Sequence, residues 1–230
     1  MLINLLRRCY NFLTWDPFLT KIWSQEAEDL FILELYQGKS PGVYLDVGAH
    51  QPKKFSNTYK LYKLGWNGVC IDPNPEFKKL WAQQRPRDKF YNIGISQRKD
   101  HLKYYKFSEP AYNGFFDASV KDHQFVKSTL EEIVEIQTMP LRDVLQMAEI
   151  FNTIDVLSID VEGMDDEVLR TFPFEDYKPN IIVIEIGADA VKMTLQTNSN
   201  YIHPITKFLE NQGYSMRSVL MNSVIFMKDC

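Results

Sequence analysis

The sequence predicts a single α/β domain in which a mostly parallel β-sheet carries helices on both faces and ends in an antiparallel hairpin. Short apolar segments alternate with amphipathic ones from residue 43 onward, a pattern typical of β-α-β units and a parallel sheet. Glycine or proline stands at many of the boundaries between these segments. The chain has 230 residues and is 45% hydrophobic, which is enough material for one core.

The first half of the chain supplies a β-α-β-α-β run. Residues 1–37 are expected to be mainly helical, with Ser24 as an N-cap before acidic residues. The strands expected next are short apolar runs at 43–47, 69–72 and 90–96. The helices expected between them lie at 56–64 and 76–84. Gly65 follows the first of these helices as a C-cap residue does.

The second half continues the alternation after a weaker stretch. From residue 140 onward, the expected helices are 140–148, 165–172 and 203–212. The expected strands are 153–159 and 180–186, followed by a terminal hairpin over 214–227. The weaker stretch before them is expected to hold a short strand at 103–107, a loop at 112–119 and an irregular or helical link at 121–127.

The charge of the chain indicates which binding partners to expect, and its cysteine content indicates the cell compartment. The formal net charge is −4, so no overall positive field attracts a polyanion, and nucleic acid is not expected as a partner. Cys9, Cys70 and Cys230 are odd in number and far apart, unlike a zinc site or a disulfide framework. The sequence therefore predicts a protein of the reducing cytoplasm.

The N-terminal segment is apolar but not a membrane span. Arg7 and Arg8 interrupt it, and no apolar run reaches the roughly 18 residues that a spanning helix needs. Its large apolar residues are Leu2, Leu5, Leu6, Phe12, Leu13, Trp15, Phe18 and Trp23. We expect this segment to dock on its own domain or to join a homo-oligomer, and peripheral contact with a membrane is the alternative.

Acidic residues mark the ends of the first two predicted strands. Asp46 and Asp72 are 26 positions apart (72 − 46), close to the spacing at which an acid takes ribose hydroxyls in a nucleotide-binding β-α-β unit. Gly48 follows the first strand, but the further glycines that approach a pyrophosphate are missing. This favours S-adenosylmethionine, which has no phosphate, over NAD. Strand-end turns with solvated acids remain an alternative.

Several ordered segments resemble FkbM-type methyltransferases. They are Ser24-Gln25-Glu26-Ala27-Glu28-Asp29, Asp46-Val47-Gly48-Ala49-His50, Ser56-Asn57-Thr58, Leu61-Tyr62, Gly65-Trp66-Asn67-Gly68, Ile71-Asp72-Pro73-Asn74-Pro75 and Ser158-Ile159-Asp160-Val161-Glu162-Gly163. The resemblance implies a Rossmann-like class I methyltransferase fold at 38–230, capped by a helical segment at 1–37. It also implies S-adenosylmethionine as donor and O-methylation of sugars or natural products. Ala27 stands where the family has glycine, and Asn113-Gly114-Phe115-Phe116 fits its middle region only loosely.

The resemblance also assigns donor-binding residues. It implies that Asp46, Gly48, Ala49 and His50 line the methionine side of the donor. Asp72 would hold the ribose, for which a carboxylate is a suitable hydrogen-bond acceptor. The remaining candidates are Asn74 on the adenosine side and the pair Asn57 and Thr58, which could instead cap the following helix.

Three further carboxylates are expected where the methyl group is transferred. Asp160 and Glu162 follow one predicted strand and Glu185 ends the next, so all three lie at one edge of the sheet. They would repel each other unless hydrogen-bonded, protonated or bound to a cation. Asp160 and Glu185 are therefore candidate ligands of Mg²⁺ or another divalent cation. The alternatives are a general base without metal, and helix capping by Glu162 and Asp165.

The acceptor is the least defined part of the prediction. An aromatic set could stack on a sugar or belong to the core: Tyr104, Tyr105, Phe107, Tyr112, Phe115 and Phe116. The favoured function is an O-methyltransferase acting on a small molecule or glycan. An NAD-dependent oxidoreductase and a non-catalytic nucleotide-binding module are the alternatives, and neither requires the segment from Asp160 to Gly163.

Overall fold

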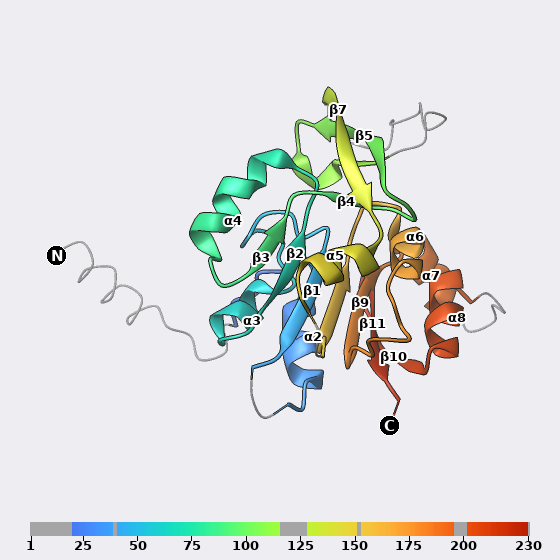
Figure 1. Ribbon diagram of the computed structural model, residues 1–230. Coiled ribbons are helices and arrows are strands. Elements are labelled where there is room, and N and C mark those ends of the chain that lie inside the picture. Colours follow the sequence, from blue (N-terminus) through green and yellow to red (C-terminus); the bar gives the residue numbers. More distant parts are fainter. Residues whose placement is uncertain (1–19, 39–40, 116–127, 151–152, 196–201, 230) are drawn as a thin grey trace, which may run out of the picture.

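Seven strands form the larger of two β-sheets (Figure 1). The structure, a computed structural model, describes residues 20–38, 41–115, 128–150, 153–195 and 202–229. In chain order the strands of the larger sheet are β1 (Val43–Val47), β2 (Asn67–Ile71), β3 (Lys89–Tyr91), β8 (Val156–Ile159), β9 (Ile181–Glu185), β10 (Tyr214–Val219) and β11 (Ser223–Lys228). Across the sheet they are ordered β10-β11-β9-β8-β1-β2-β3.

The strand directions confirm the predicted fold. β3, β2, β1, β8 and β9 lie side by side in that order, and each neighbouring pair is parallel. β11 pairs antiparallel with β9 and with β10, as the predicted terminal hairpin requires. The mostly parallel sheet with its C-terminal hairpin is the Rossmann-like class I methyltransferase fold. All five parallel strands end at the same edge of the sheet.

Helices cover both faces of this sheet, as expected. The helices on one face are α2 (Glu28–Leu35), α3 (Tyr59–Lys63) and α4 (Lys78–Gln84). Those on the other face are α5 (Leu141–Met147), α6 (Asp165–Arg170), α7 (Ala188–Leu195) and α8 (Pro204–Asn211). Strand residues alternate between the two cores: Tyr44 packs with α3 and α4, whereas Leu45 packs with the opposite helices. The sequence did not predict α7.

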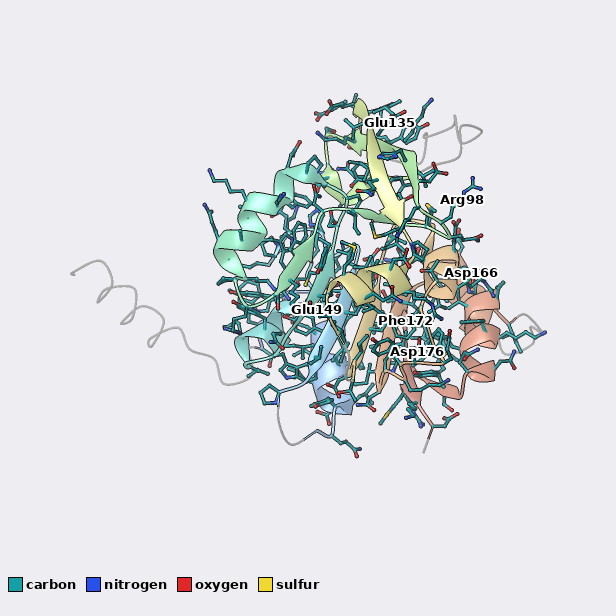
Figure 2. The ribbon with its side chains drawn as sticks, viewed as in Figure 1. Arg98, Glu135, Glu149, Asp166, Phe172 and Asp176 are labelled. Carbon is teal, nitrogen blue, oxygen red and sulfur yellow. The ribbon has the colours of Figure 1, made fainter. Side chains whose placement is uncertain are left out.

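A second, four-stranded sheet lies beyond the ends of the parallel strands (Figure 1). Its strands are ordered β4 (Gly94–Ile95), β7 (Leu130–Met139), β5 (Asp100–Phe107) and β6 (Gly114–Phe115). The single strand expected at 90–96 is wrong, because the chain leaves the first sheet after Tyr91 and enters the second at Gly94. Figure 2 shows Glu135 on β7 in this outer sheet, well away from Phe172 in the core.

The stretch between residues 98 and 139 also departs from expectation. The strand expected at 103–107 is confirmed and begins earlier, at Asp100. The loop expected at 112–119 is wrong at its start, where a 3₁₀ turn ending at Tyr112 is followed by β6. The rest of that loop and the link expected at 121–127 lie outside the described residues.

The N-terminal helix is shorter than expected. Of the predicted helical segment 1–37, only Glu28–Leu35 is helical within the described part, and residues 1–19 lie outside it. Ser24 is not the N-cap: its hydroxyl donates to the Asp29 carboxylate at 3.1 Å. Ala27 occupies the cap position with φ 69°, a left-handed conformation that costs an alanine about 1 kcal/mol. A glycine at this position would adopt the same conformation without that cost.

Candidate active site

A pocket opens between the carboxyl edge of the parallel sheet and the second sheet. The space enclosed by its lining residues, including the solvent at its open mouth, is about 730 Å³. Five of the predicted site residues line it: Gly48, His50, Asp72, Asp160 and Glu162. The structure therefore brings three of the eight expected donor residues and two of the three expected catalytic acids together in one cavity, and Glu185 is not among the lining residues.

Gly48 lets the loop after β1 touch the loop after β8. Its φ is 78°, and a Cβ at this position would lie 1.6 Å from the carbonyl oxygen of Asp160. The backbone N–H groups of Gly48 and Ala49 both donate to the carbonyl of Ile71, at 2.9 and 3.0 Å. Only glycine fits this approach, which places the two loops on either side of the pocket.

Asp72 is held in a fixed orientation at the end of β2. One carboxylate oxygen accepts the backbone N–H of His50 and the other accepts that of Asn74, each at 2.8 Å. Burial raises the pKa of Asp72 to about 7, and these two hydrogen bonds oppose that rise. The carboxylate keeps further acceptor sites for a ligand in the pocket.

His50 lies in the pocket wall with unsatisfied ring nitrogens. Both nitrogens are buried and make no hydrogen bond of normal geometry within the described chain. Its carbonyl accepts the Trp81 indole N–H at 2.8 Å, and its φ is 47°, so the ring position is imposed by the fold. Burial lowers the pKa of His50, which favours the neutral imidazole. A neutral ring offers one donor and one acceptor to a ligand.

Asn74 and three other predicted residues lie behind the pocket wall. The Asn74 amide nitrogen is buried without a partner, although its oxygen caps the following 3₁₀ turn. The Thr58 hydroxyl donates to Asp46 at 2.5 Å, and the Asn57 amide donates to Ser158 at 3.1 Å. These side chains are outside the pocket lining, so their direct contact with a ligand stays a prediction.

Arg85 supports this buried layer and was not identified from the sequence. Its guanidinium pairs with Asp88 at 2.6 Å, and both side chains are fully buried. It also donates to the hydroxyls of Thr58 and Tyr44 and to the carbonyl of Pro52, at 3.0, 2.8 and 3.3 Å. Arg85 thus connects α4 to the loop that carries Gly48 and His50.

Carboxylates gather at the ends of β8 and β9. One oxygen each from Asp160, Asp165 and Glu185 lies within 4.8 Å of the other two. Both oxygens of Asp165 accept backbone N–H groups, from Val161 and Gly163, at 3.0 and 3.1 Å. Asp165 therefore orders the loop before α6, and it joins the predicted pair of Asp160 and Glu185.

Burial raises the pKa of each acid at this edge. Burial raises the pKa of Asp160 to about 6, and the hydrogen bond that Asp160 shares with Glu185 opposes this rise. Burial and the neighbouring charge of Asp160 raise the pKa of Glu185 to about 10. One proton between them satisfies that hydrogen bond at neutral pH. Burial and the neighbouring charge of Asp160 raise the pKa of Glu162 to about 8.

These raised pKa values destabilise the ligand-free fold at neutral pH. The folded chain binds more protons than the unfolded chain, so this contribution to stability is present at low pH and is lost as pH rises through about 6 to 8. A positive charge in the pocket would reverse the effect, since it favours the carboxylate forms. The site is therefore suited to a cationic ligand.

The second sheet forms the opposite wall. Tyr104 and Phe115 line the pocket with their rings 5.1 Å apart, and Asn113 lies beside them. Of the other predicted aromatic residues, Phe107 is buried away from the pocket lining and Tyr112 is 38% exposed. Phe116 lies outside the described residues. The lining contains no lysine or arginine among the residues that the structure describes.

The segment before α2 closes one side of the pocket. Gln25 is among the lining residues. Next to it, the Glu26 carboxylate accepts the backbone N–H of Asn222 at 2.9 Å, and Glu28 accepts the Ser223 hydroxyl at 3.3 Å. The turn between β10 and β11 thus holds this segment in place.

No helix in the described residues is long and apolar enough to cross a membrane.

A family model described as the methyltransferase FkbM domain matches residues 46–216. No curated protein matches the chain. Among solved structures, the methyltransferase FkbM from Methylobacillus flagellatus KT is similar with a TM-score of 0.46 and 12% identity, over 82% of this chain and 43% of that one. This chain thus spans less than half of that protein.

Two further solved structures cover nearly the full length of both chains. Precorrin-6y C5,15-methyltransferase from Geobacter metallireducens GS-15 has a TM-score of 0.45 and 12% identity, over 94% of this chain and 95% of that chain. A TehB-like S-adenosylmethionine-dependent methyltransferase from Corynebacterium glutamicum has a TM-score of 0.41 and 12% identity, over 98% and 97%. Likeness at this level adds no argument about the reaction.

Proposed function

The chain belongs to the FkbM family of methyltransferases, and on this premise we propose that it methylates a hydroxyl oxygen of a sugar, glycan or small natural product. The donor is S-adenosylmethionine, which supplies an electrophilic methyl group on a positively charged sulfur. The observation that carries the proposal is the pocket in which the fixed Asp72 carboxylate and the acids at the end of β8 face one cavity.

The residues around the pocket fit the donor. Asp72 is expected to accept both ribose hydroxyls, because its carboxylate is already oriented by two backbone donors. His50 has buried ring nitrogens without a hydrogen bond of normal geometry in the described chain, and Gly48 leaves the pocket floor free of a side chain. The raised pKa values of Asp160 and Glu162 support a cation beside them. Ala49, Asp46, Asn57, Thr58 and Asn74 are outside the pocket lining, and their direct contact with the donor stays a prediction.

Asp160 is the proposed general base. It lines the pocket, and Glu185 shares a proton with it and so holds its orientation. The Asp160 carboxylate would take the hydroxyl proton while the acceptor oxygen bonds to the methyl carbon, the bond from that carbon to the donor sulfur breaks, and S-adenosylhomocysteine leaves. Glu162 lines the same pocket and would hydrogen-bond a neighbouring hydroxyl of the acceptor.

A bound divalent cation is the second arrangement that would relieve the repulsion among these carboxylates. Asp160, Asp165 and Glu185 offer three oxygen atoms within 4.8 Å of one another, which suits Mg²⁺ or Ca²⁺. A bound cation would replace the proton shared by Asp160 and Glu185 and would lower the pKa of the acceptor hydroxyl. Asp165 is already committed to two backbone N–H groups, which favours the shared proton.

The acceptor wall supports a neutral, hydroxyl-rich molecule. Tyr104 and Phe115 provide ring faces of the kind that pack against the C–H face of a sugar. Acidic side chains line the pocket, and no lysine or arginine does so among the described residues. An acceptor with phosphate or carboxylate near the reacting hydroxyl would therefore be repelled. We further propose a cytoplasmic location, for which the free, buried thiol of Cys70 is suited.

Methyl transfer can be followed with S-adenosylmethionine that carries an isotopically labelled methyl group. The protein is incubated with matched panels of neutral, amino and phosphorylated or uronic sugars, including lipid-linked glycans, and the products are identified by mass and fragmentation. We expect the label on an oxygen atom of a neutral or amino sugar. Label found on carbon or nitrogen would contradict O-methylation, and preference for the anionic panel would contradict the acceptor class.

A further inference from the structure

A basic and aromatic surface surrounds α3, next to the pocket mouth. We propose that this surface, named here the α3 patch, docks on an anionic lipid surface. The patch consists of Lys21, Ile22, Trp23, Lys53, Lys54, Phe55, Tyr59, Lys60, Lys63 and Leu64. This proposal does not depend on the reaction proposed above.

Direct contacts unite the segment before α2 with α3. The Trp23 ring packs edge-on against Tyr59, with ring centres 4.6 Å apart. Lys21 lies over the Trp23 ring at 4.0 Å, and Lys63 approaches the same ring at 5.7 Å. The Lys60 ammonium donates to the carbonyl of Lys21 at 2.9 Å. The two segments therefore present one continuous surface.

Apolar side chains are exposed among these lysines. Leu64 is 55% exposed, Ile22 is 42% exposed and Phe55 is 39% exposed. Phe55 also has φ 59°, so its exposure follows from a backbone conformation that the loop imposes. Tryptophan and tyrosine rings flanked by lysines are typical of the membrane interface, where the ring is buried among headgroups and the ammonium stays in water.

The charge of the patch is opposite to that of the whole chain. The chain carries a net charge of −4, yet the charged side chains of the patch are all lysines. Within the described residues, the ion pair recorded for them is that of Lys54 with Glu109 at 3.3 Å, and both partners are largely exposed. Such a pair is weak and is readily exchanged for a lipid headgroup. A local positive surface on an acidic protein favours an anionic membrane.

The α3 patch adjoins the mouth of the pocket, so a membrane bound to the patch would affect access to the pocket. Phe55 belongs to the patch and also lines the pocket, with its ring 6.0 Å from that of His50. A membrane on the α3 patch would therefore lie beside the pocket mouth. The sequence that leads into the patch, residues 1–19, is itself rich in apolar residues and contains Arg7 and Arg8.

Vesicle sedimentation of the full chain tests the proposal. Phosphatidylcholine vesicles are compared with vesicles that contain equal parts of phosphatidylcholine and phosphatidylglycerol. We expect binding to the anionic vesicles only, with loss at high salt. The double substitution Lys60→Glu and Lys63→Glu should weaken binding at least about tenfold, since each lysine near the surface contributes to the attraction. The exposed pair Lys207→Glu and Arg217→Glu, on α8 and β10, is the matched control.

A second variant keeps the test independent of folding. Because Lys60 bonds the backbone of Lys21, the neutral variant Lys54→Gln with Lys63→Gln leaves that bond intact and should also reduce vesicle binding. Circular dichroism confirms the fold of each variant. Equal vesicle binding by the patch and control variants would overturn the proposal, as would no binding to anionic vesicles. Tighter binding of a single-stranded oligonucleotide than of these vesicles would assign the patch to nucleic acid instead.

Discussion

Replacement of Asp160 by asparagine is expected to lower kcat about 10²- to 10⁴-fold. The amide keeps the shape of the side chain but cannot accept a proton from the acceptor hydroxyl. Affinity for S-adenosylhomocysteine, whose sulfur carries no charge, should change little, because the proposed contacts to it are made by Asp72 and the loop after β1. The measurement is steady-state kinetics with an identified acceptor, beside S-adenosylhomocysteine binding. Asp166→Asn, on α6 nearby, is the matched control (Figure 2).

The pH dependence gives a second signature of the same residue. The pKa of Asp160 is raised to about 6, so its carboxylate is depleted as pH falls through that value and kcat should fall with it. The positive sulfur of the donor favours the carboxylate, so the limb in kcat is expected at or below about 6. Any residual activity of Asp160→Asn should lack this limb.

A chelator distinguishes the two chemical roles of Asp160. If a proton is shared with Glu185, chelator leaves kcat unchanged. If a cation is bound by Asp160, Asp165 and Glu185, chelator abolishes activity, added Mg²⁺, Mn²⁺ or Ca²⁺ restores it, and Asp160→Asn raises the metal concentration required. Full activity of Asp160→Asn on a methylated acceptor would contradict both roles and would move the reacting centre elsewhere.

Arg85→Ala is expected to lower the free energy of unfolding by about 3–5 kcal/mol. The substitution leaves the buried Asp88 carboxylate without its cation and removes the donors to Thr58, Tyr44 and Pro52. Urea denaturation at constant pH measures the change. Arg98→Ala is the control, because the Arg98 side chain is 83% exposed, and its effect should stay within about 0.5 kcal/mol. A loss below about 1 kcal/mol in Arg85→Ala would show that the pair is not a structural centre.

The alternating part of the fold was predictable because its strands are buried on both faces. The strand Ile181–Glu185 is fully apolar up to its last residue, as a central parallel strand must be. The acids Asp72 and Asp160 could be placed together because parallel strands end at one edge. In these segments, the local apolar pattern and the burial in the folded protein both indicate a strand.

The second sheet was not predictable for the opposite physical reason. Most side chains of β7 face solvent, and its glutamates, including Glu131 and Glu132, remove the alternating apolar pattern that identifies a strand. β4 and β6 are two residues long and exist because they pair with longer neighbours. The sequence predicted the strand that carries Tyr104 and named Tyr104 and Phe115 as candidates to stack on a sugar, but only the structure places both beside the pocket.

The buried support of the site was hidden in the same way. Arg85 lies near the end of a helix, where an arginine is usually solvated, and its partners Tyr44 and Pro52 are 41 and 33 positions away. Gln25 reaches the pocket because Glu26 and Glu28 bind a turn almost 200 residues further along the chain, at separations of 196 and 195. Neither contact has a local sequence signal.

Calorimetric titration with S-adenosylhomocysteine and with NAD tests the central claim most directly. We expect S-adenosylhomocysteine to bind and NAD to give no heat of binding. We expect Asp72→Ala to weaken the binding of S-adenosylhomocysteine by about 1.5–3 kcal/mol, because charge-assisted hydrogen bonds to the ribose are lost. Asp176→Ala, an exposed acid away from the pocket, should bind as the parent protein does (Figure 2). Micromolar binding of NAD with no response to S-adenosylhomocysteine would contradict the account.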